Sequence, residues 1–166
     1  FELALNEHKT RLLEFGRFAA TARQLRGERK PATFDILGFT HACGQGRETG
    51  RFVVRRLTMA TRLRAKLRAI KEALLRNLHR HPGEVGRWLQ RVMQGFFNYH
   101  AIPGNMRRLA AFRTRVVRTW LRVLRRRSQR HRMPWARFAR LATRWVPYAR
   151  LVHPSPSVRF YAKYPR

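Results

Sequence analysis

The sequence predicts an α+β fold that is mainly α, with a short N-terminal antiparallel β-hairpin region, a basic bundle of about four helices and an extended C-terminal tail. Three observations predict it. Apolar and polar residues alternate in the first third of the chain, as in half-buried strands. After Thr58 the apolar residues recur every three or four positions, as on the buried side of a helix. Residues 147–166 contain four prolines and neither pattern. A hydrophobic content of 44% supplies a core.

The strands are expected near the N-terminus. Residues 11–15, 33–40 and 51–57 have strand-like patterns with β-branched or aromatic side chains. Glycines between residues 44 and 50 supply the positive-φ positions of a hairpin connection, so the last two segments are expected to pair. Residues 18–32 are expected to form a surface loop or a short helix.

Four helices are expected after the strands. The first ends at His81-Pro-Gly83, and the second runs from about Glu84 to His100. Asn105 is a suitable N-cap for the third, and Pro134 suits the first turn of the fourth. The expected buried residues are Val85, Trp88, Leu89, Val92, Phe96 and Tyr99 in the second helix, Leu109, Phe112, Val116 and Trp120 in the third, and Trp135, Phe138, Leu141 and Trp145 in the fourth.

The chain has a formal net charge of +30 at pH 7. None of its 8 acidic residues lies after Glu84, so the helices that follow cannot neutralise themselves. Such a surface attracts polyanions by releasing their counterions, which predicts nucleic acid as the partner. Arginine greatly outnumbers lysine, and this bias has two alternative explanations: a preference for forked phosphate contacts or a GC-rich genome.

The third helix carries most of the candidate contacts. Its arginines would repel one another at i,i+4 spacing unless an anion relieved them. The aromatic residues near Trp88 permit base stacking, but the helical spacing of Trp88 and Trp120 favours a core role. The expected nucleic-acid contacts are Arg62, Lys66, Arg107, Arg108, Arg113, Arg115, Arg118, Arg122, Arg125, Arg126, Arg127 and Arg130.

Several kinds of chemistry are excluded by composition. Asp35 is the single aspartate, so the chain lacks the clustered carboxylates that hold catalytic Mg²⁺. Cys43 is the single cysteine, which excludes an internal disulfide and a standard four-ligand zinc pattern. We therefore expect no metal and no cofactor in this chain. With no apolar run of membrane-spanning length and no signal peptide, a soluble, cytoplasmic protein is expected. Because the chain starts at Phe1, we expect a fragment.

Two sets of motifs resemble the bacterial group II intron reverse transcriptases, which are also maturases. Asn6-Glu-His-Lys-Thr10, followed by Thr33-Phe-Asp-Ile-Leu-Gly-Phe39, resembles the segments that end their palm domain. The thumb and maturase-specific region is resembled by Gly86-Arg-Trp88, Phe97-Asn-Tyr99, Pro103-Gly-Asn105 and Leu124-Arg-Arg-Arg-Ser-Gln129. The resemblance covers nearly the whole chain.

The resemblance implies specific roles. Lys9 would lie near the phosphates of the incoming nucleotide and assist the leaving pyrophosphate. Leu37, Gly38 and Phe39 would form the primer grip, a tight hairpin that positions the primer 3′ end. The helices would hold the RNA template/DNA primer duplex and group II intron RNA. The fingers and the aspartate-bearing palm motifs would precede this chain, so Mg²⁺ and RNA-directed DNA polymerase activity are expected only in the full-length enzyme.

The resemblance divides the chain into four parts and leaves one alternative. A free-standing basic RNA-binding or nucleoid protein without enzymatic role would have a similar size and charge. The expected parts are the end of the palm at 1–57, the first thumb helix at 58–81, the thumb and maturase-specific helices at 82–146 and the tail at 147–166.

Overall fold

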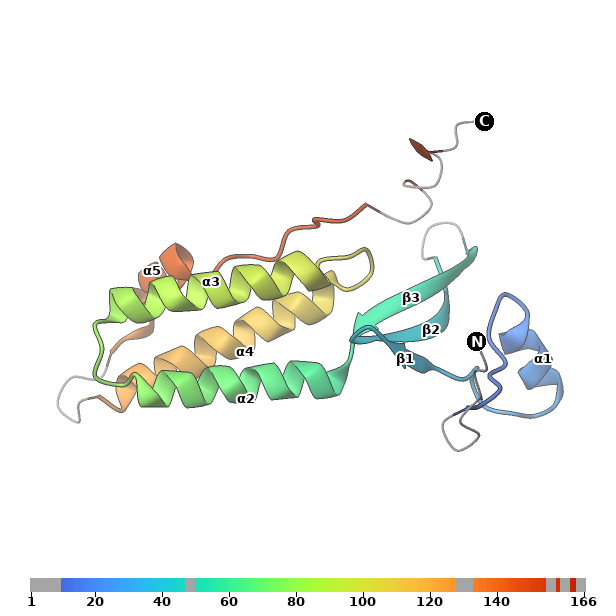
Figure 1. Ribbon diagram of the computed structural model, residues 1–166, viewed down its shortest axis with the longest axis horizontal. Coiled ribbons are helices and arrows are strands. Elements are labelled where there is room, and N and C mark those ends of the chain that lie inside the picture. The colour runs from blue at the N-terminus through green and yellow to red at the C-terminus, as the bar shows by residue number, and fades with distance from the viewer. Residues whose placement is uncertain (1–9, 47–49, 128–132, 155–157, 159–161, 164–166) are drawn as a thin grey trace, which may run out of the picture. The chain divides into compact units, whose positions relative to one another are not determined.

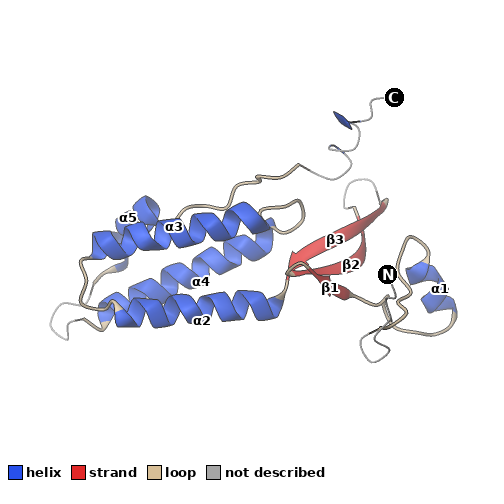
Figure 2. Ribbon diagram, in the orientation of Figure 1, coloured by secondary structure: helices blue, strands red, loops and turns tan. Residues whose placement is uncertain are grey.

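A computed structural model describes residues 10–46, 50–127, 133–154, 158, 162 and 163 (Figure 1). The chain divides into two compact units, Phe1–Arg55 and Arg56–Arg166. A three-stranded antiparallel sheet precedes four long helices, which confirms the predicted α+β, mainly α class (Figure 2). None of the described helices is both long and apolar enough to cross a bilayer.

The N-terminal unit contains a short helix, α1 (Ala19–Leu25), and most of the sheet. In the sheet, β2 (Phe39–Gln45) lies between β1 (Phe34–Ile36) and β3 (Phe52–Thr58), which ends in the second unit. The predicted hairpin between β2 and β3 is confirmed, since the Gly46 N–H donates to the Arg51 carbonyl at 2.8 Å. The short helix satisfies the expectation for residues 18–32.

Two strand predictions were wrong. Residues 11–15 are not a strand, although Leu13 and Phe15 are partly buried. Residues 33–40 are not one strand, because a two-residue turn at Leu37 and Gly38 separates β1 from β2, with Ile36 opposite Phe39. Both turn residues have positive φ, 49° and 81°, as two-residue hairpin turns of type I′ require.

The helices of the second unit are α2 (Ala60–Arg76), α3 (Pro82–His100), α4 (Met106–Arg125) and α5 (Trp135–Trp145). Helix α2 packs along α4, and α3 packs along α5 (Figure 1). Helix α2 ends before His81, where its end was predicted. The Asn77 side chain donates to the Ala73 carbonyl at 2.8 Å, and turns follow. The next helix then begins at Pro82, where the His81 ring accepts a hydrogen bond from the Gly83 N–H.

The core lies among these four helices and includes Trp120, whose ring meets Phe138 edge to face at 5.4 Å between centroids. The predicted apolar stripe of α4 is confirmed, since its members are buried: Leu109, Phe112, Val116 and Trp120.

The second half of the buried stripe of α3 was placed one residue too early. Val85 and Leu89 were predicted correctly, but the next buried residues are Met93, Phe97 and His100. Trp88, Val92 and Phe96 are only partly buried beside this stripe, and Tyr99 is 52% exposed. In α5, Trp135 is also exposed, at 54%, because it begins an eleven-residue helix whose buried residues are Phe138 and Ala142.

Asn105 is the N-cap residue of α4, as predicted, but its side chain makes no capping hydrogen bond. Its Oδ1 instead accepts from the Thr58 N–H at 3.0 Å, and its Nδ2 donates to Thr58 Oγ1 at 2.6 Å and to the His100 carbonyl at 2.8 Å. Asn105 is fully buried, and its hydrogen bonds hold the start of α2, the end of α3 and the start of α4 together.

Close packing of α3 on α5 depends on Gly86. A Cβ atom at this position would lie 2.5 Å from Cγ of Trp145. The predicted tail is extended over residues 147–154, and its Val152 N–H donates to the Ala101 carbonyl at 3.2 Å. The aromatic residues Phe160, Tyr161 and Tyr164 of the tail lie outside the described residues.

Candidate nucleic-acid interface

Positive charge in the helical unit is not neutralised internally. Residues 56–166 contain 28 Lys and Arg against 2 acidic residues, Glu72 and Glu84. Within the described parts of the chain, ion pairs join arginines and glutamates of the N-terminal unit only: Arg23 and Arg26 with Glu14 and Glu28. No described Lys or Arg of α2 to α5 has a carboxylate partner, so their positive charge is left for an external anion to neutralise.

Five of these cations line one shallow groove of about 510 Å³ between α2 and α4. Arg115, Arg118 and Arg122 follow one another at intervals of three and four residues, which places them on one side of α4. Arg68 and Lys71, three residues apart, line the groove from α2. Leu67 and Thr119 also line it. A row of guanidinium and ammonium groups of this kind matches a sugar–phosphate backbone.

The groove unites predicted and unpredicted contacts. Arg115, Arg118 and Arg122 were predicted from the sequence, whereas Arg68 and Lys71 were missed. Their own i,i+3 spacing on a predicted helix was visible, but it showed only a basic face. The pairing of α2 with α4, which makes that face one wall of a groove, is a tertiary fact that one sequence does not contain.

Four other predicted contacts donate to backbone carbonyls and thereby support the fold. Arg113 donates to the carbonyls of Val146 and Pro147 at 3.0–3.2 Å, and its guanidinium lies 3.6 Å from the ring centroid of Tyr148. The remaining bonds are Arg108 to Thr58, Arg125 to Met133 at 3.2 Å and Arg127 to His79 at 3.2 Å.

The remaining predicted contacts are spread over the unit. Arg62, Arg107 and Arg126 are exposed, and Lys66 is partly buried. Arg130 lies outside the described residues, as does Lys9.

The three residues expected to form a primer grip lie at the β1–β2 turn. Leu37 is 77% exposed at its tip, Gly38 follows it, and Phe39 is buried at the start of β2. Beside the turn, Thr40 Oγ1 donates to Asp35 Oδ1 at 2.6 Å, which ties β1 to β2. The geometry is that of a tight hairpin with an apolar tip.

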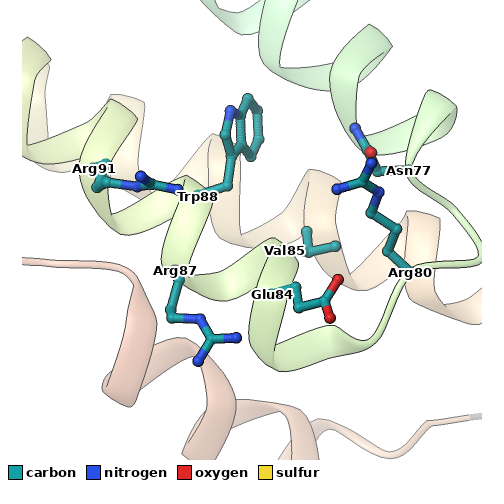
Figure 3. Close-up of a pocket in the computed structure, with 7 residues that line it drawn as sticks. All are labelled: Asn77, Arg80, Glu84, Val85, Arg87, Trp88 and Arg91. Atoms are coloured by element: carbon teal, nitrogen blue, oxygen red, sulfur yellow. The ribbon is translucent and has the colours of Figure 1, made fainter.

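A second pocket, of about 470 Å³, lies where α2 gives way to α3 (Figure 3). Trp88 rises from α3 on one side, and Asn77 and Arg80 lie on the other side (Figure 3). The Glu84 carboxylate lies below Val85, near the middle of this view, and Arg91 lies beside the indole (Figure 3). Trp88 therefore contacts the core but also contributes to a surface pocket, a role that the core prediction missed.

Comparison with known proteins adds no identification. No protein-family model matches the chain, and neither does a curated protein or a solved structure. Over the positions that the structure describes, no group of three His, Cys, Asp or Glu side chains is arranged to hold a metal ion.

Proposed function

We propose that this chain is the RNA-binding C-terminal region of a group II intron reverse transcriptase/maturase. It would grip intron RNA and the template–primer duplex, and so support splicing and RNA-directed DNA synthesis in the bacterial cytoplasm. The observation that carries RNA binding is the groove between α2 and α4, where five cations converge without a carboxylate partner. A duplex backbone supplies the missing negative charge at regular intervals.

The β1–β2 turn supports the more specific part of the proposal. Leu37 and Gly38 adopt the tight two-residue turn that the resemblance to a primer grip requires. Gly38 has no Cβ, so its backbone can approach a nucleic acid closely. An apolar tip at Leu37 suits contact with the sugar and base of a primer end.

The described residues do not fit the catalytic Mg²⁺ of such an enzyme. Asp35 is the single aspartate, and it is exposed and engaged with Thr40. No step of DNA synthesis is therefore assigned to this chain, and the nucleotidyl transfer belongs to the parent protein.

Salt-dependent RNA binding tests the proposal. With about 6–10 phosphates engaged, log K against log salt should slope by about −4 to −9. Replacing Arg115, Arg118 and Arg122 together by Gln should weaken binding and reduce the slope by roughly 2 to 3. The matched control replaces three exposed arginines elsewhere, and should change the slope by less than about 1. These are Arg137, Arg140 and Arg150.

Two outcomes would contradict the proposal. A wild-type slope shallower than about −2 would exclude an extended phosphate interface. Equal losses in the groove variant and the control would show that only net charge matters, as in an unspecific nucleoid protein. The genomic DNA directly upstream separates the alternatives further: a reading frame ending in a Tyr-Ala-Asp-Asp segment supports the reverse transcriptase, and a start codon supports a free-standing protein.

A further inference from the structure

The pocket at the α2–α3 corner combines one aromatic plane with several polar groups. The Trp88 indole is partly buried, with one part packed against the core and another lining the pocket. Opposite it lies Arg80, whose side chain is exposed (Figure 3). The volume of about 470 Å³ lies within the roughly 300–1,000 Å³ of small-molecule sites. An indole facing a guanidinium across such a space is suited to hold a flat, unpaired base between them.

Glu84 is the informative member of this pocket. It is one of two acidic residues in the helical unit, and it lines a pocket that also contains Arg80, Arg87 and Arg91. It nevertheless forms no ion pair with any of them. A pocket for phosphate alone would be weakened by a carboxylate. The first turn of α3 benefits from a negative charge, which explains an acid near this position but not its placement in the pocket.

We propose that this pocket binds an unpaired guanine of the RNA, stacked between Trp88 and Arg80, with the Glu84 carboxylate on its Watson–Crick edge. The inference rests on the proposed RNA-binding function. It adds selectivity for one base, whereas the groove between α2 and α4 contacts only phosphates. An ionised carboxylate only accepts hydrogen bonds, through two oxygens. Guanine alone among the four bases offers two adjacent donors, N1–H and N2–H, on that edge. Adenine, cytosine and uracil offer one donor group there, so Glu84 distinguishes guanine from all three.

The experiment measures tryptophan fluorescence during titration of the full chain with two short RNAs. Both are oligouridines, one with a central guanosine and the other with a central adenosine. Stacking on Trp88 is expected to quench its emission. A good bidentate contact discriminates between bases by roughly 5- to 150-fold, so the guanosine RNA should bind at least about fivefold more tightly.

Three variants separate the contributions. Glu84→Gln should retain binding of both RNAs but bring the affinity ratio to about one, since the amide replaces one acceptor by a donor. Trp88→Phe keeps an aromatic ring and should lose most of the quench, which would assign the signal to Trp88. The groove variant Arg118→Gln with Arg122→Gln should weaken both RNAs and leave the ratio unchanged, because phosphate contacts carry no base information.

The outcomes distinguish the two proposals. If neither RNA binds, the proposed RNA-binding function and the guanine site are both wrong. If both RNAs bind with equal affinity, or if Glu84→Gln leaves a guanine preference intact, the guanine site is wrong and the groove proposal stands. Circular dichroism of each variant confirms that the helices are intact, and the Glu84 result decides the case because that side chain is exposed.

Discussion

At the residue scale, one buried amide holds the helical unit together at the junction of three segments. Asn105 uses both ends of its side chain, accepting from the Thr58 backbone and donating to the Thr58 hydroxyl and the His100 carbonyl. Arg108 adds a hydrogen bond to the Thr58 carbonyl. These contacts explain why the N-cap residue of α4 makes no capping hydrogen bond with its side chain: its polar atoms already have other partners.

Asn105→Ala tests the contribution of these hydrogen bonds to stability. The substitution would leave the N–H and the hydroxyl of Thr58 buried without partners, and each such group costs about 1–3 kcal/mol. The His100 carbonyl would keep its hydrogen bond from the Ile102 N–H at 2.9 Å. The free energy of unfolding should fall by about 2–4 kcal/mol in total, measured by urea denaturation. Asn98→Ala on the exposed side of α3 is the control. If the free energy of unfolding fell by less than about 1 kcal/mol, water would be replacing the hydrogen bonds of Asn105.

His100 makes the stability of this unit depend on pH. Burial lowers the pKa of His100 below its ordinary value of about 6.5, and a hydrogen bond with the Phe96 carbonyl opposes that shift. The unfolded chain therefore takes up a proton more readily than the folded one. The contribution of His100 to stability is complete above about pH 6.5 and is lost as the pH falls toward the lowered pKa.

Measuring the free energy of unfolding between about pH 7 and about pH 5 tests the direction of this effect. The free energy of unfolding of the wild type should decrease from about pH 7 to about pH 5. His100→Gln should lower stability at neutral pH and flatten this dependence, whereas His79→Gln, at an exposed position, serves as the control. A dependence of equal steepness in His100→Gln would assign the effect to other groups.

At the scale of the elements, the α3–α5 pair depends on the absence of one side chain. Gly86→Ala would place a methyl group within 2.5 Å of the Trp145 ring and force the helices apart. Such overpacking costs about 1–3 kcal/mol. Gly95→Ala provides the matched control, because this glycine is on the same helix and nothing lies within 4 Å of its added Cβ. It should raise stability by up to about 1 kcal/mol through helix propensity.

Thermal denaturation of both variants decides this point. Opposite signs of the two changes in melting temperature are expected, with Gly86→Ala lower and Gly95→Ala higher than the wild type. If both variants were stabilised, the helix propensity of alanine would outweigh the contact with Trp145, and the close approach would not be needed.

The elements also show how far periodicity alone reaches. The stripe of α4 was predictable because Leu109, Phe112, Val116 and Trp120 are its large apolar residues and share one period. The stripe of α3 was not, since Phe96 and Phe97 are adjacent and fit two phases; in the structure Phe97 is buried and Phe96 is only partly buried. The turn at Leu37 has no residue typical of positive φ at its first position, so periodicity continued the strand through it.

The candidate site also has a part that was predictable from the sequence and a part that was not. Spacing predicted three arginines of the α4 wall, but neither the α2 wall nor the pocket beside Trp88 was predictable, because both depend on which helices become neighbours. Arg113 was expected at the nucleic-acid surface, yet its hydrogen bonds to Val146 and Pro147 tie α4 to the start of the tail. A charged residue does not reveal from its sequence position whether its partner is a phosphate or a carbonyl group.

At the scale of the whole molecule, the uncompensated charge opposes folding and favours binding. Salt should therefore act in opposite directions on the two. Raising the ionic strength from about 0.1 M to about 1 M shortens the Debye length from about 10 Å to about 3 Å, which screens repulsion among the helices. The melting temperature should rise over this range while RNA affinity falls steeply.

Differential scanning fluorimetry in potassium chloride and in an equal concentration of potassium glutamate measures the first effect. A rise in both salts indicates screening of like charges. A melting temperature that falls with salt would show that attractive pairs, such as those of Arg23 and Arg26 in the N-terminal unit, dominate instead.

The contact between Gly86 and Trp145 also constrains how the sequence can diverge. Neither position can change freely while the other keeps its present residue, because any side chain at 86 occupies space that the indole now fills. Homologues with alanine or serine at position 86 should carry a smaller residue at position 145, and those with tryptophan at 145 should retain glycine at 86. The two columns of an alignment would then covary although 59 positions separate them. Selection would act on the pair, and a lineage could replace both residues only through a less stable intermediate.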